Sequence, residues 1–478
     1  MVGGGVAGLG AALTLARSGH QVTLVERDET PLPATADEAF AWDRRGAPQV
    51  RHSHALLARL RNLLRDRHPD VLAALLDAGA TELRFGDALP PTMVEFEREP
   101  GDEDLVMLAC RRITFEWVLR RAVLGQPGVT VRTGVAVEGF TASDADRAGG
   151  PPTVTGVRLA GDGAVTADLV VCATGRRSTL PGWTAAAGGR PVSEEVDDTG
   201  IVYFSRFYRL RDGFDLPDRN GAIGGDLGYL KYGVFLGDNR TFSITLATST
   251  DDDVLRPMLD DGDVFEHVAA LLTATVDYVD GRAEPITGVH KMAGLLNRRR
   301  RWVTDGVPAL LGVHPVGDAR LCTNPLYGRG CSTGFWDAQL LADAVTDHPD
   351  DPLAQSLTHD EATRRFIVPW YKAAVTQDAE ARRVAAAIMA GQDPDGDPTD
   401  ARTAMRGVLR EGLVPALRTD AVVLRCFMRS LNLLSSPDAL ATDPEVGARI
   451  FAVWNDRANR PPEPVLGPPR HELLAALA

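Results

Sequence analysis

Apolar positions near the N-terminus change period twice, and the change predicts a turn, a helix and a strand within the first 27 residues. Glycines crowd residues 3–10, an apolar stripe at helical spacing covers about residues 7–18, and Gly19 interrupts it. Residues 21–25 read Gln-Val-Thr-Leu-Val, a short run typical of a buried strand. The pattern therefore predicts a glycine turn, a helix and a buried strand in succession.

Helical and strand periods continue to alternate up to about residue 195. Apolar residues recur at helical spacing in residues 55–67 and 112–122, whereas residues 129–135 and 153–159 have the composition of strands. Residues 167–173 are predicted to form a buried strand, because they contain the continuous apolar run Leu-Val-Val-Cys-Ala, which is expected for a parallel strand covered on both faces. This succession predicts an α/β fold with a parallel sheet.

The pattern changes between about residues 200 and 289, where strand-like segments follow one another. Residues 231–236 and 241–246 flank a Gly-Asp-Asn turn and predict a hairpin of an antiparallel sheet. A buried strand returns at residues 309–313, and a second glycine-rich turn at residues 324–334 leads into a helix over about residues 335–344. After about residue 360 the pattern is helical, with breaks rich in Pro and Asp.

These changes divide the chain into four segments. Residues 1–195 and 291–350 are predicted to form the two parts of a Rossmann-like nucleotide-binding domain, residues 196–290 an inserted antiparallel sheet domain, and residues 351–478 a helical C-terminal region. The length of 478 residues is sufficient for about three domain-sized units.

The first glycine turn has the spacing of a dinucleotide-binding fingerprint. Gly3, Gly5 and Gly8 form G-x-G-x-x-G, where the missing side chains permit a tight turn, approach of the backbone to a pyrophosphate, and close packing of the helix. Glu26 ends the following strand about twenty residues later, where a carboxylate can accept ribose hydroxyls. Only two residues precede Gly3, so either the chain starts upstream or the first strand is shorter than the usual five or six residues, roughly.

Composition and charge narrow the class of partner. A net charge of -14 argues against nucleic acid or an anionic membrane surface, because phosphate binding needs a basic field. No run of eighteen apolar residues and no signal peptide is found, so we expect a cytoplasmic protein without a transmembrane segment. The five cysteines show neither C-x-x-C nor metal-ligand spacing, which predicts no metal site and excludes the dithiol flavin reductases. The sequence leaves the oligomeric state open.

Several further residues are candidates for binding or chemistry. His52 and His54 precede the helix at residues 55–67. Either they serve a ligand, or Ser53 or His54 only caps the helix while His52 faces solvent. Arg112 stands at the entrance of a helix and either reaches a phosphate or ribityl oxygen or is solvated. Residues 297–301 form a basic cluster, interpreted first as a solvated face and alternatively as a site for the NADPH phosphate.

The inserted sheet is rich in aromatic residues that can line a pocket for a small hydrophobic molecule, although ordinary sheet packing explains about half of them. The pocket residues that we predict are Tyr203, Phe204, Tyr229, Tyr232 and Phe235.

Three motifs in this order resemble the single-component FAD-dependent monooxygenases of the para-hydroxybenzoate hydroxylase fold, a glutathione reductase-type Rossmann architecture. The motifs are G-x-G-x-x-G with Glu26, the Ala-Thr-Gly-Arg-Arg-Ser turn at residues 173–178, and Gly-Asp followed by Asn-Pro-Leu-Tyr-Gly-Arg-Gly at residues 317–330. The resemblance covers about residues 1 to 350. Residues 49–57 and 110–116 look more like the branch that contains bacterial polyene epoxidases of polyether antibiotic biosynthesis.

The resemblance implies a set of FAD-binding residues. The ADP half is assigned to the three glycines with Glu26 and Arg27, and Arg112 is expected to lie along the cofactor. Asp318 is expected to bind a ribityl hydroxyl, and the loop from Pro325 to Gly330 to pass the flavin ring. The other residues assigned to the cofactor are Gly175, Gly317 and Gly328. Thr174 replaces the acid usual in the family's Asp-Gly turn, which puts that turn's role in NADPH handling in doubt.

The implied activity is that of an FAD-dependent monooxygenase, which epoxidises or hydroxylates a hydrophobic secondary metabolite. NAD(P)H reduces FAD, O₂ adds to the flavin, and a C4a-hydroperoxide delivers oxygen to an alkene or an electron-rich ring. The protein's part is to position the substrate and exclude water, and a phenolic substrate would gain from a base, for which His52 and His54 are candidates.

Two other functions remain open at this point. A flavin-dependent reductase or dehydrogenase of the geranylgeranyl-reductase type shares the FAD motifs, and a flavin-binding protein without turnover would share them as well. Flavin halogenases share the fold, but their W-x-W-x-x-P signature is absent from the sequence, which disfavours halogenation.

Overall fold

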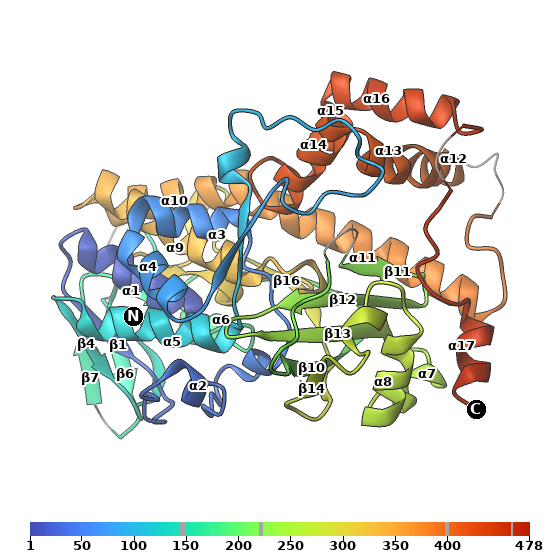
Figure 1. Cartoon of the computed structure of the whole chain (residues 1–478). Helices are drawn as coiled ribbons and strands as arrows, with labels where there is room; N and C mark the ends of the chain where they lie inside the picture. Colours follow the sequence, from blue (N-terminus) through green and yellow to red (C-terminus); the bar gives the residue numbers. More distant parts are fainter. Residues whose placement is uncertain (144–149, 162, 219–222, 397–400, 460–461) are drawn as a thin grey trace.

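The computed structural model describes residues 1–143, 150–161, 163–218, 223–396, 401–459 and 462–478. Its architecture is α/β, with a Rossmann-like unit, an inserted antiparallel sheet and a helical C-terminal region (Figure 1). This is the fold class that the sequence predicts. The predicted loop at residues 142–152 and the linker at residues 391–398 lie partly outside the described residues.

The N-terminal unit is organised around a parallel sheet with a very short centre. β1 (Val22–Val25) pairs with β4 (Val129–Arg132), and β8 (Val170–Cys172) pairs with β19 (Val313–Pro315), both in parallel. Val2 forms parallel bridges to β1 and to β8, so it lies between the two pairs. The centre of the sheet therefore rests on a single bridge residue.

One face of this sheet is covered by helices. α1 (Val6–Arg17) packs against α5 (Arg112–Gly125) and α9 (Gly330–Asp347), and their apolar sides form the largest core of the protein. Gly10 allows the close approach of α1 and α9, because a Cβ there would lie 2.8 Å from the Phe335 ring. The same layer contains α2 (Ala36–Ala39), α3 (Ala58–Arg67) and α4 (Pro69–Asp77).

The opposite face of the parallel sheet packs against a second core, which is centred on an antiparallel sheet of three strands. That sheet has the order β5–β6–β7, and α6 packs on β5. The elements of this side are β5 (Val137–Ala142), β6 (Val154–Leu159), β7 (Gly163–Thr166) and α6 (Leu180–Ala186). A separate antiparallel pair, β2 (Thr81–Arg84) and β3 (Val106–Ala109), adjoins α3.

The inserted sheet is antiparallel, with the order β11–β12–β13–β10–β14 and with β15 also paired to β10. Its strands are β10 (Ile201–Leu210), β11 (Gly224–Asp226), β12 (Leu230–Leu236), β13 (Thr241–Ser249), β14 (Ala283–Pro285) and β15 (His290–Met292). The predicted hairpin joins β12 to β13. Asp238 in its turn is fully buried and accepts hydrogen bonds from the Arg111 side chain at 2.5 and 3.0 Å, which fixes the hairpin to the start of α5.

The pairing divides the side chains of this sheet between two faces. Along β10, Tyr203 and Ser205 point to one side, and Phe204 and Tyr208 to the other. The second side, which we call the back face, packs against α7 (Leu255–Met258), α8 (Gly262–Ala270) and α17 (Arg470–Ala476). The first side, the front face, meets the nucleotide-binding unit through Leu326.

The chain returns to the nucleotide-binding unit through β16 (Leu296–Arg301), which lies between β9 (Ser193–Asp198) and β20 (Leu321–Cys322). β9 spans the predicted domain boundary at residue 195. Asn297 and Arg300 are buried, so the interpretation of residues 297–301 as a purely solvated face is wrong. The reason is that β16 is a central strand covered on both faces, since Asn297 and Arg300 are three residues apart, point to opposite sides and are both buried. The short pair β17 (Val303–Thr304) and β18 (Val307–Pro308) follows.

The C-terminal region is helical, as predicted, and it contacts both halves of the molecule. Its helices are α10 (Pro352–Phe366), α11 (Val368–Met389), α12 (Ala401–Val408), α13 (Val414–Thr419), α14 (Ala421–Leu431), α15 (Ala439–Thr442), α16 (Pro444–Asn455) and α17. α11 lies along β16 and β20. The light blue segment before β3 extends to α13 and α14 (Figure 1), where Arg425 is paired with Asp102 at 2.8 Å. α17 lies apart from the other C-terminal helices, beside α7 and α8 (Figure 1).

Candidate functional site

The three glycines of the fingerprint have different surroundings. Gly3 has a φ of +100°, and a Cβ there would lie 2.5 Å from the Ala173 carbonyl oxygen. At Gly8 a Cβ would lie 2.0 Å from the Gly3 carbonyl oxygen, whereas at Gly5 nothing lies within 4 Å. Gly3 and Gly8 are therefore required by packing, and Gly5 leaves free space beside the N-terminus of α1. No side chain caps this helix start, so its N–H groups remain available to an anion.

Glu26 lies at the end of β1, beside the glycine turn. Its carboxylate accepts hydrogen bonds from the backbone N–H of Gly4 at 2.7 Å and of Asp28 at 3.0 Å, and the residue is 7% exposed. Two backbone bonds hold this acid in place while its oxygens keep further acceptor capacity for ribose hydroxyls.

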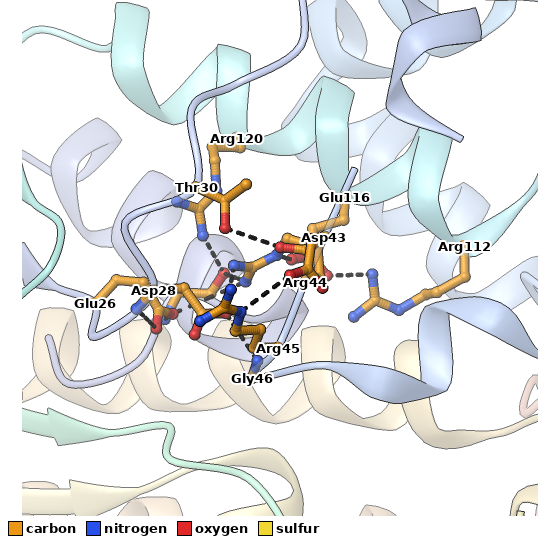
Figure 2. Close-up of polar contacts among 11 residues, drawn as sticks. Glu26, Asp28, Thr30, Asp43, Arg44, Arg45, Gly46, Arg112, Glu116 and Arg120 are labelled. Atoms are coloured by element: carbon orange, nitrogen blue, oxygen red, sulfur yellow. Dashed lines mark hydrogen bonds and ion pairs between the residues drawn. The ribbon is translucent and has the colours of Figure 1, made fainter. Parts of the chain in front are cut away.

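A buried cluster of charged side chains surrounds the glycine turn (Figure 2). Arg44 lies at its centre and donates to Glu116 at 2.6 Å and to Asp28 at 2.9 Å. Arg44 and Arg120 both also donate to the carbonyl oxygen of Gly4, at 3.3 and 2.9 Å. The sequence interpretation did not select any of these four charged residues. Their signal is weak, because each is a single charged residue in a different segment and only the fold brings them together.

The start of α5 contributes Arg112, which donates to Glu116 at 2.5 Å. Burial would raise the pKa of Glu116, but the guanidinium groups of Arg112 and Arg44 outweigh it and lower that pKa to about 2. Arg112 is buried and also faces Cys331 in the first turn of α9. The solvated interpretation of Arg112 is therefore wrong, since this arginine stays charged between α5 and the N-terminus of α9.

Asp318 lies in the turn after β19 and is the most unusual acid of the site. Burial raises its pKa to about 6, although Arg176, Arg112 and Arg300 oppose the shift. Among the described residues it accepts no hydrogen bond, so its carboxylate is an open acceptor near three cations. A ribityl hydroxyl would supply the missing donor.

The turn that carries Asp318 is held in place by a hydrogen bond to α9. Gly317 has a φ of +57° and donates its N–H to Asp337 of α9 at 2.9 Å. Asp337 also accepts from Thr363 at 3.0 Å, and its other neighbour at 3.0 Å is His359. The acid and its partners form a buried network that the sequence interpretation missed, because Asp337 lies within an otherwise ordinary helical pattern.

The loop from Pro325 to Gly330 is held by Asp378 of α11. The Asp378 carboxylate accepts from Asn297 at 2.6 Å, from Asn324 at 2.8 Å and from the Tyr327 hydroxyl at 2.7 Å. Asn324 in turn accepts from the N–H of Leu326 at 3.0 Å. Gly328 has a φ of +64°, and a Cβ there would lie 2.9 Å from the Cβ of Ala55, whereas a Cβ at Gly330 would meet nothing within 4 Å.

The loop also touches the front face of the inserted sheet. The Tyr203 hydroxyl donates to the Asn324 side chain, and Leu326 packs with Tyr203 and Ala247. Burial raises the pKa of Tyr203, and the Asp378 charge raises it further, so this phenol stays neutral and acts as a donor. The residues predicted to face the flavin ring are thereby placed against the sheet predicted to bind the substrate.

His52 and His54 occupy different positions. His52 is buried and lies with Nδ1 3.2 Å from the Ser205 hydroxyl, while its ring is 6.3 Å from that of His290. Burial, with contributions from His290 and Arg176, lowers the pKa of His52 to about 4. His54 turns toward Arg112, and its Nδ1 lies 2.9 Å from the His52 carbonyl oxygen. Neither histidine simply caps a helix, because α3 begins only at residue 58.

A chain of hydroxyl groups continues from His52 across the front face. Ser205 and Thr245 are 2.9 Å apart, Thr245 donates to Ser53 at 2.7 Å, and Ser53 donates to Ser243 at 2.7 Å. We call Ser205, Thr245, Ser53 and Ser243 the hydroxyl chain. Each hydroxyl donates one proton, so the direction of these bonds requires Ser205 to donate to Thr245 and His52 to donate from Nδ1. Nε2 of a neutral His52 is then left as an acceptor.

The five aromatic residues predicted to line a pocket do not share a face. Phe204, Tyr229 and Tyr232 are buried in the core of the back face. The hydroxyls of Tyr229 and Tyr232 donate to backbone carbonyls of Pro468 and Leu466, at 2.7 and 2.5 Å. The prediction is therefore narrowed to Tyr203 and Phe235. Strand alternation directs Phe204 and Tyr232 away from the nucleotide-binding unit, and Tyr229, which precedes β12, lies in the same core of the back face.

The remaining predicted residues vary in position. Gly175 has a φ of +72° with nothing within 4 Å of an added Cβ, while the Thr174 hydroxyl donates to Ser178 at 2.5 Å. Arg176 is near His52 and Asp318, since its charge affects the pKa of both. The side chain of Arg27 is exposed. Within the described ranges, no group of His, Cys, Asp or Glu could hold a metal ion. No described helix is long and apolar enough to cross a membrane.

Comparisons with known proteins agree with this arrangement. Residues 1–77 match the family described as FAD dependent oxidoreductase. The chain is 27% identical over 473 residues to Protein Rv3254 of Mycobacterium tuberculosis, an alignment that covers 94% of this chain and 92% of that protein.

Solved structures share the fold at low sequence identity. PqsL, a probable FAD-dependent monooxygenase from Pseudomonas aeruginosa, matches with a TM-score of 0.56 and 16% identity over 81% of this chain and 94% of its own. OxyS anhydrotetracycline hydroxylase from Streptomyces rimosus matches with a TM-score of 0.55 and 18% identity over 91% of this chain and 75% of its own. The myxobacterial chondrochloren halogenase CndH matches with a TM-score of 0.58 and 16% identity over 92% of this chain and 98% of its own.

Proposed function

We propose that this protein is an FAD-dependent monooxygenase that uses NAD(P)H and O₂ to oxygenate a small organic substrate. The observation that carries the proposal is the bond from Tyr203 to Asn324, which joins the front face of the inserted sheet to the loop predicted to pass the flavin. The match of residues 1–77 to FAD dependent oxidoreductases supports the cofactor. The fold shared with PqsL and OxyS supports the reaction class.

The residues present fit FAD in several places. The open space at Gly5 and the uncapped start of α1 suit a pyrophosphate, and Glu26 suits the ribose hydroxyls. Arg44 and Arg120 supply positive charge beside the turn. Asp318, which is partly buried and has no hydrogen-bond donor among the described residues, suits a ribityl hydroxyl. When bound there, FAD would supply redox chemistry with NAD(P)H and O₂ that no side chain can supply.

The start of α9 suits the flavin ring. Arg112 and the N-terminal N–H groups at Gly330 place positive charge at one point, and an electron-rich ring would be stabilised there. The Asp378 network holds the adjoining loop rigid, which favours a defined distance between ring and substrate. The protein's contribution is thus positioning and charge.

The front face suggests the class of substrate. It presents the hydroxyl chain and His52 between Tyr203 and Phe235, so its floor is polar and its edges are aromatic. A planar molecule with a phenolic or enolic hydroxyl fits this surface better than a hydrocarbon polyene, because the hydroxyl can donate to Nε2 of His52. We therefore favour hydroxylation of an electron-rich ring, and keep epoxidation as the alternative.

The test is a spectroscopic and product assay on purified protein loaded with FAD. Candidate phenols, enols and polyenes are added with NADPH or NADH under anaerobic conditions, and ¹⁸O₂ is then admitted. We expect one class to accelerate bleaching of the flavin absorbance and to yield a product that carries one ¹⁸O atom. Reduction without labelled product would favour the reductase alternative. A halogenated product in the presence of bromide would overturn the proposal in favour of the activity in CndH's name.

A further inference from the structure

A cavity of about 330 Å³ lies between the β16–β18 segment and α10. Among its lining residues are five arginines, which is unusual in a protein with a net charge of -14. We call this cavity the arginine pocket. Its arginines are Arg299, Arg300, Arg301, Arg320 and Arg364.

The acids around the arginine pocket neutralise its arginines incompletely. Glu195 is shared between Arg299, at 3.5 Å, and Arg301. Asp360 is shared between Arg320, at 2.5 Å, and Arg364, at 3.9 Å. Each of these two carboxylates therefore faces two guanidinium groups.

The other acids that line the arginine pocket do not balance the positive charge of its arginines. Arg300 is paired with Glu194 at 2.5 Å, and in the described part of the chain the acids that line the cavity are Asp305 and Asp360. Among the described residues, the lining itself has five guanidinium groups and two carboxylates, whereas Glu194, Glu195 and Asp337 act on these arginines from outside the lining. The neighbouring positive charges also affect Arg299. Burial lowers the pKa of its guanidinium group, and the charges of Arg301 and Arg320 lower it further.

The geometry of the donors suits a tetrahedral anion. Arg364 has a side chain that is 67% exposed and Arg299 has only a long contact to Glu195, so both can turn toward a ligand. Arg320, in contrast, is buried and fixed by Asp360 and by Thr363 at 2.9 Å. A fixed guanidinium at the base with two adaptable ones at the rim is a suitable arrangement for several charge-assisted hydrogen bonds.

The arginine pocket is separate from the residues assigned to FAD. None of the fingerprint glycines, Glu26, Arg112 or Asp318 lines it. Two pocket residues link it to the Gly317–Ala319 turn. Arg320 follows the turn and contacts the network of Asp337 through His359 and Thr363, and Arg300 donates to the Ala319 carbonyl oxygen at 2.8 Å and acts electrostatically on Asp318. A ligand in the pocket would therefore lie beside this turn without contacting Asp318.

We propose that the arginine pocket binds a phosphomonoester dianion. The volume accommodates a phosphate with part of the group it is attached to, and the excess positive charge favours a dianion over a neutral molecule. Two sources share this chemistry, namely the 2′-phosphate of NADPH and a free phosphorylated metabolite. Binding of the dianion itself does not depend on the proposed oxygenation, although the NADPH source would serve it.

The first experiment measures binding of inorganic phosphate by calorimetry at constant ionic strength. Arg364→Ala is the test variant, and Arg365→Ala is its matched control, because Arg365 stacks on Phe366 at 5.0 Å and does not line the pocket. We expect about tenfold weaker binding for Arg364→Ala, the size of one lost charge-assisted hydrogen bond, and no change for the control. Absence of phosphate binding to the unaltered protein, or equal loss in both variants, would overturn the proposal.

A second measurement distinguishes the sources, with 2′-AMP and 5′-AMP as probes. Tighter binding of 2′-AMP, together with a loss of NADPH over NADH preference in Arg364→Ala, assigns the pocket to NADPH. Equal binding of both probes with an unchanged preference assigns it to a free phosphorylated metabolite. If both probes bind equally to the unaltered protein and to Arg364→Ala, the phosphate lies elsewhere and the proposal is wrong. The calorimetric result is independent of turnover, so it stands even if the oxygenase assay fails.

Discussion

Asp318 is the residue whose environment most directly requires a ligand. A carboxyl group with a pKa of about 6 is protonated to a larger extent near neutral pH than an ordinary carboxyl group. The reason is that removal from water disfavours its charged form. The folded apoprotein then binds more protons than the unfolded chain between the usual pKa of 3.8 and 6. Ionised Asp318 therefore destabilises the apoprotein progressively as pH rises through this window.

Binding of FAD is expected to reverse this penalty. A ribityl hydroxyl that donates to the carboxylate stabilises its charged form, so the rise in melting temperature caused by FAD should be larger at pH 7.5 than at pH 5. Asp318→Asn should remove this difference between the two pH values. It should also weaken FAD binding, by up to about a hundredfold if bound FAD returns the pKa of Asp318 from about 6 to the usual 3.8. The measurement is thermal unfolding with and without FAD across pH. A variant that stays fully yellow, with unchanged pH dependence, would contradict the assignment.

His52 gives a second prediction at this scale. With a pKa of about 4, its ring is neutral at the pH of assay, so Nε2 can accept a hydrogen bond from a substrate hydroxyl and assist the loss of its proton as the substrate reacts, although as a weaker base than an ordinary histidine. His52→Ala should lower kcat for a phenolic substrate by about a hundredfold, the smaller end of the usual range for acid–base catalysis, with FAD content unchanged. The measurement is kcat for a series of phenolic substrates, with the FAD content of each variant determined from its flavin absorbance.

Thr245→Val is the companion variant for His52. It keeps the volume at this position but interrupts the hydroxyl chain, in which Thr245 lies between Ser205 and Ser53. If proton movement along the chain matters, Thr245→Val should also lower kcat and shift the pH profile. A loss confined to KM in both variants would instead indicate that these groups only bind the substrate.

At the scale of elements, α11 controls the loop predicted to pass the flavin. Asp378 accepts three side-chain hydrogen bonds, from Asn297, Asn324 and Tyr327. Asp378→Asn removes the charge and turns one acceptor oxygen into a donor, which leaves buried donors without partners. We expect a loss of roughly 2–3 kcal/mol in unfolding free energy. We also expect a lower ratio of oxygenated product to NADPH consumed.

The control for this prediction is Gln377→Ala, which changes an exposed neighbour on the same helix. It should leave both the unfolding free energy and the coupling ratio unchanged. If Asp378→Asn lowered stability but kept full coupling, the network would be structural only. Circular dichroism melts and a product-to-NADPH balance separate the two results.

The elements also show what a single sequence can predict. The glycine turn, the hairpin at β12–β13 and the helix α9 follow from local patterns, because glycine spacing, turn residues and apolar period act within one segment. The Arg44 and Asp378 networks could not be predicted, because their bonded members are far apart in sequence, for example 72 residues between Arg44 and Glu116 and 81 between Asn297 and Asp378, and none has a distinctive local pattern. The aromatic pocket was overpredicted because composition does not state which face of a strand a residue occupies, whereas pairing does.

At the scale of the whole molecule, the C-terminus closes the back of the inserted sheet. Arg470 donates to Asp252 at 2.7 and 3.0 Å, and Tyr229 and Tyr232 donate to backbone carbonyls just before α17. Leu473 is fully buried in the same core as Phe204. The last helix is therefore part of the domain that holds the predicted substrate surface, although more than 200 residues separate them in sequence.

Leu473→Ala tests whether this closure stabilises the front face from behind. Removal of a fully buried leucine should cost about 2–5 kcal/mol of unfolding free energy, and Glu472→Ala, at an exposed neighbour, should change it by less than about 0.5 kcal/mol. Because the loss falls on the inserted sheet, substrate affinity should weaken while FAD affinity is kept. Denaturant unfolding and separate titrations of FAD and substrate measure the three quantities. Equal weakening of both ligands would mean that the C-terminal helix stabilises the whole chain as one unit and has no particular effect on the sheet.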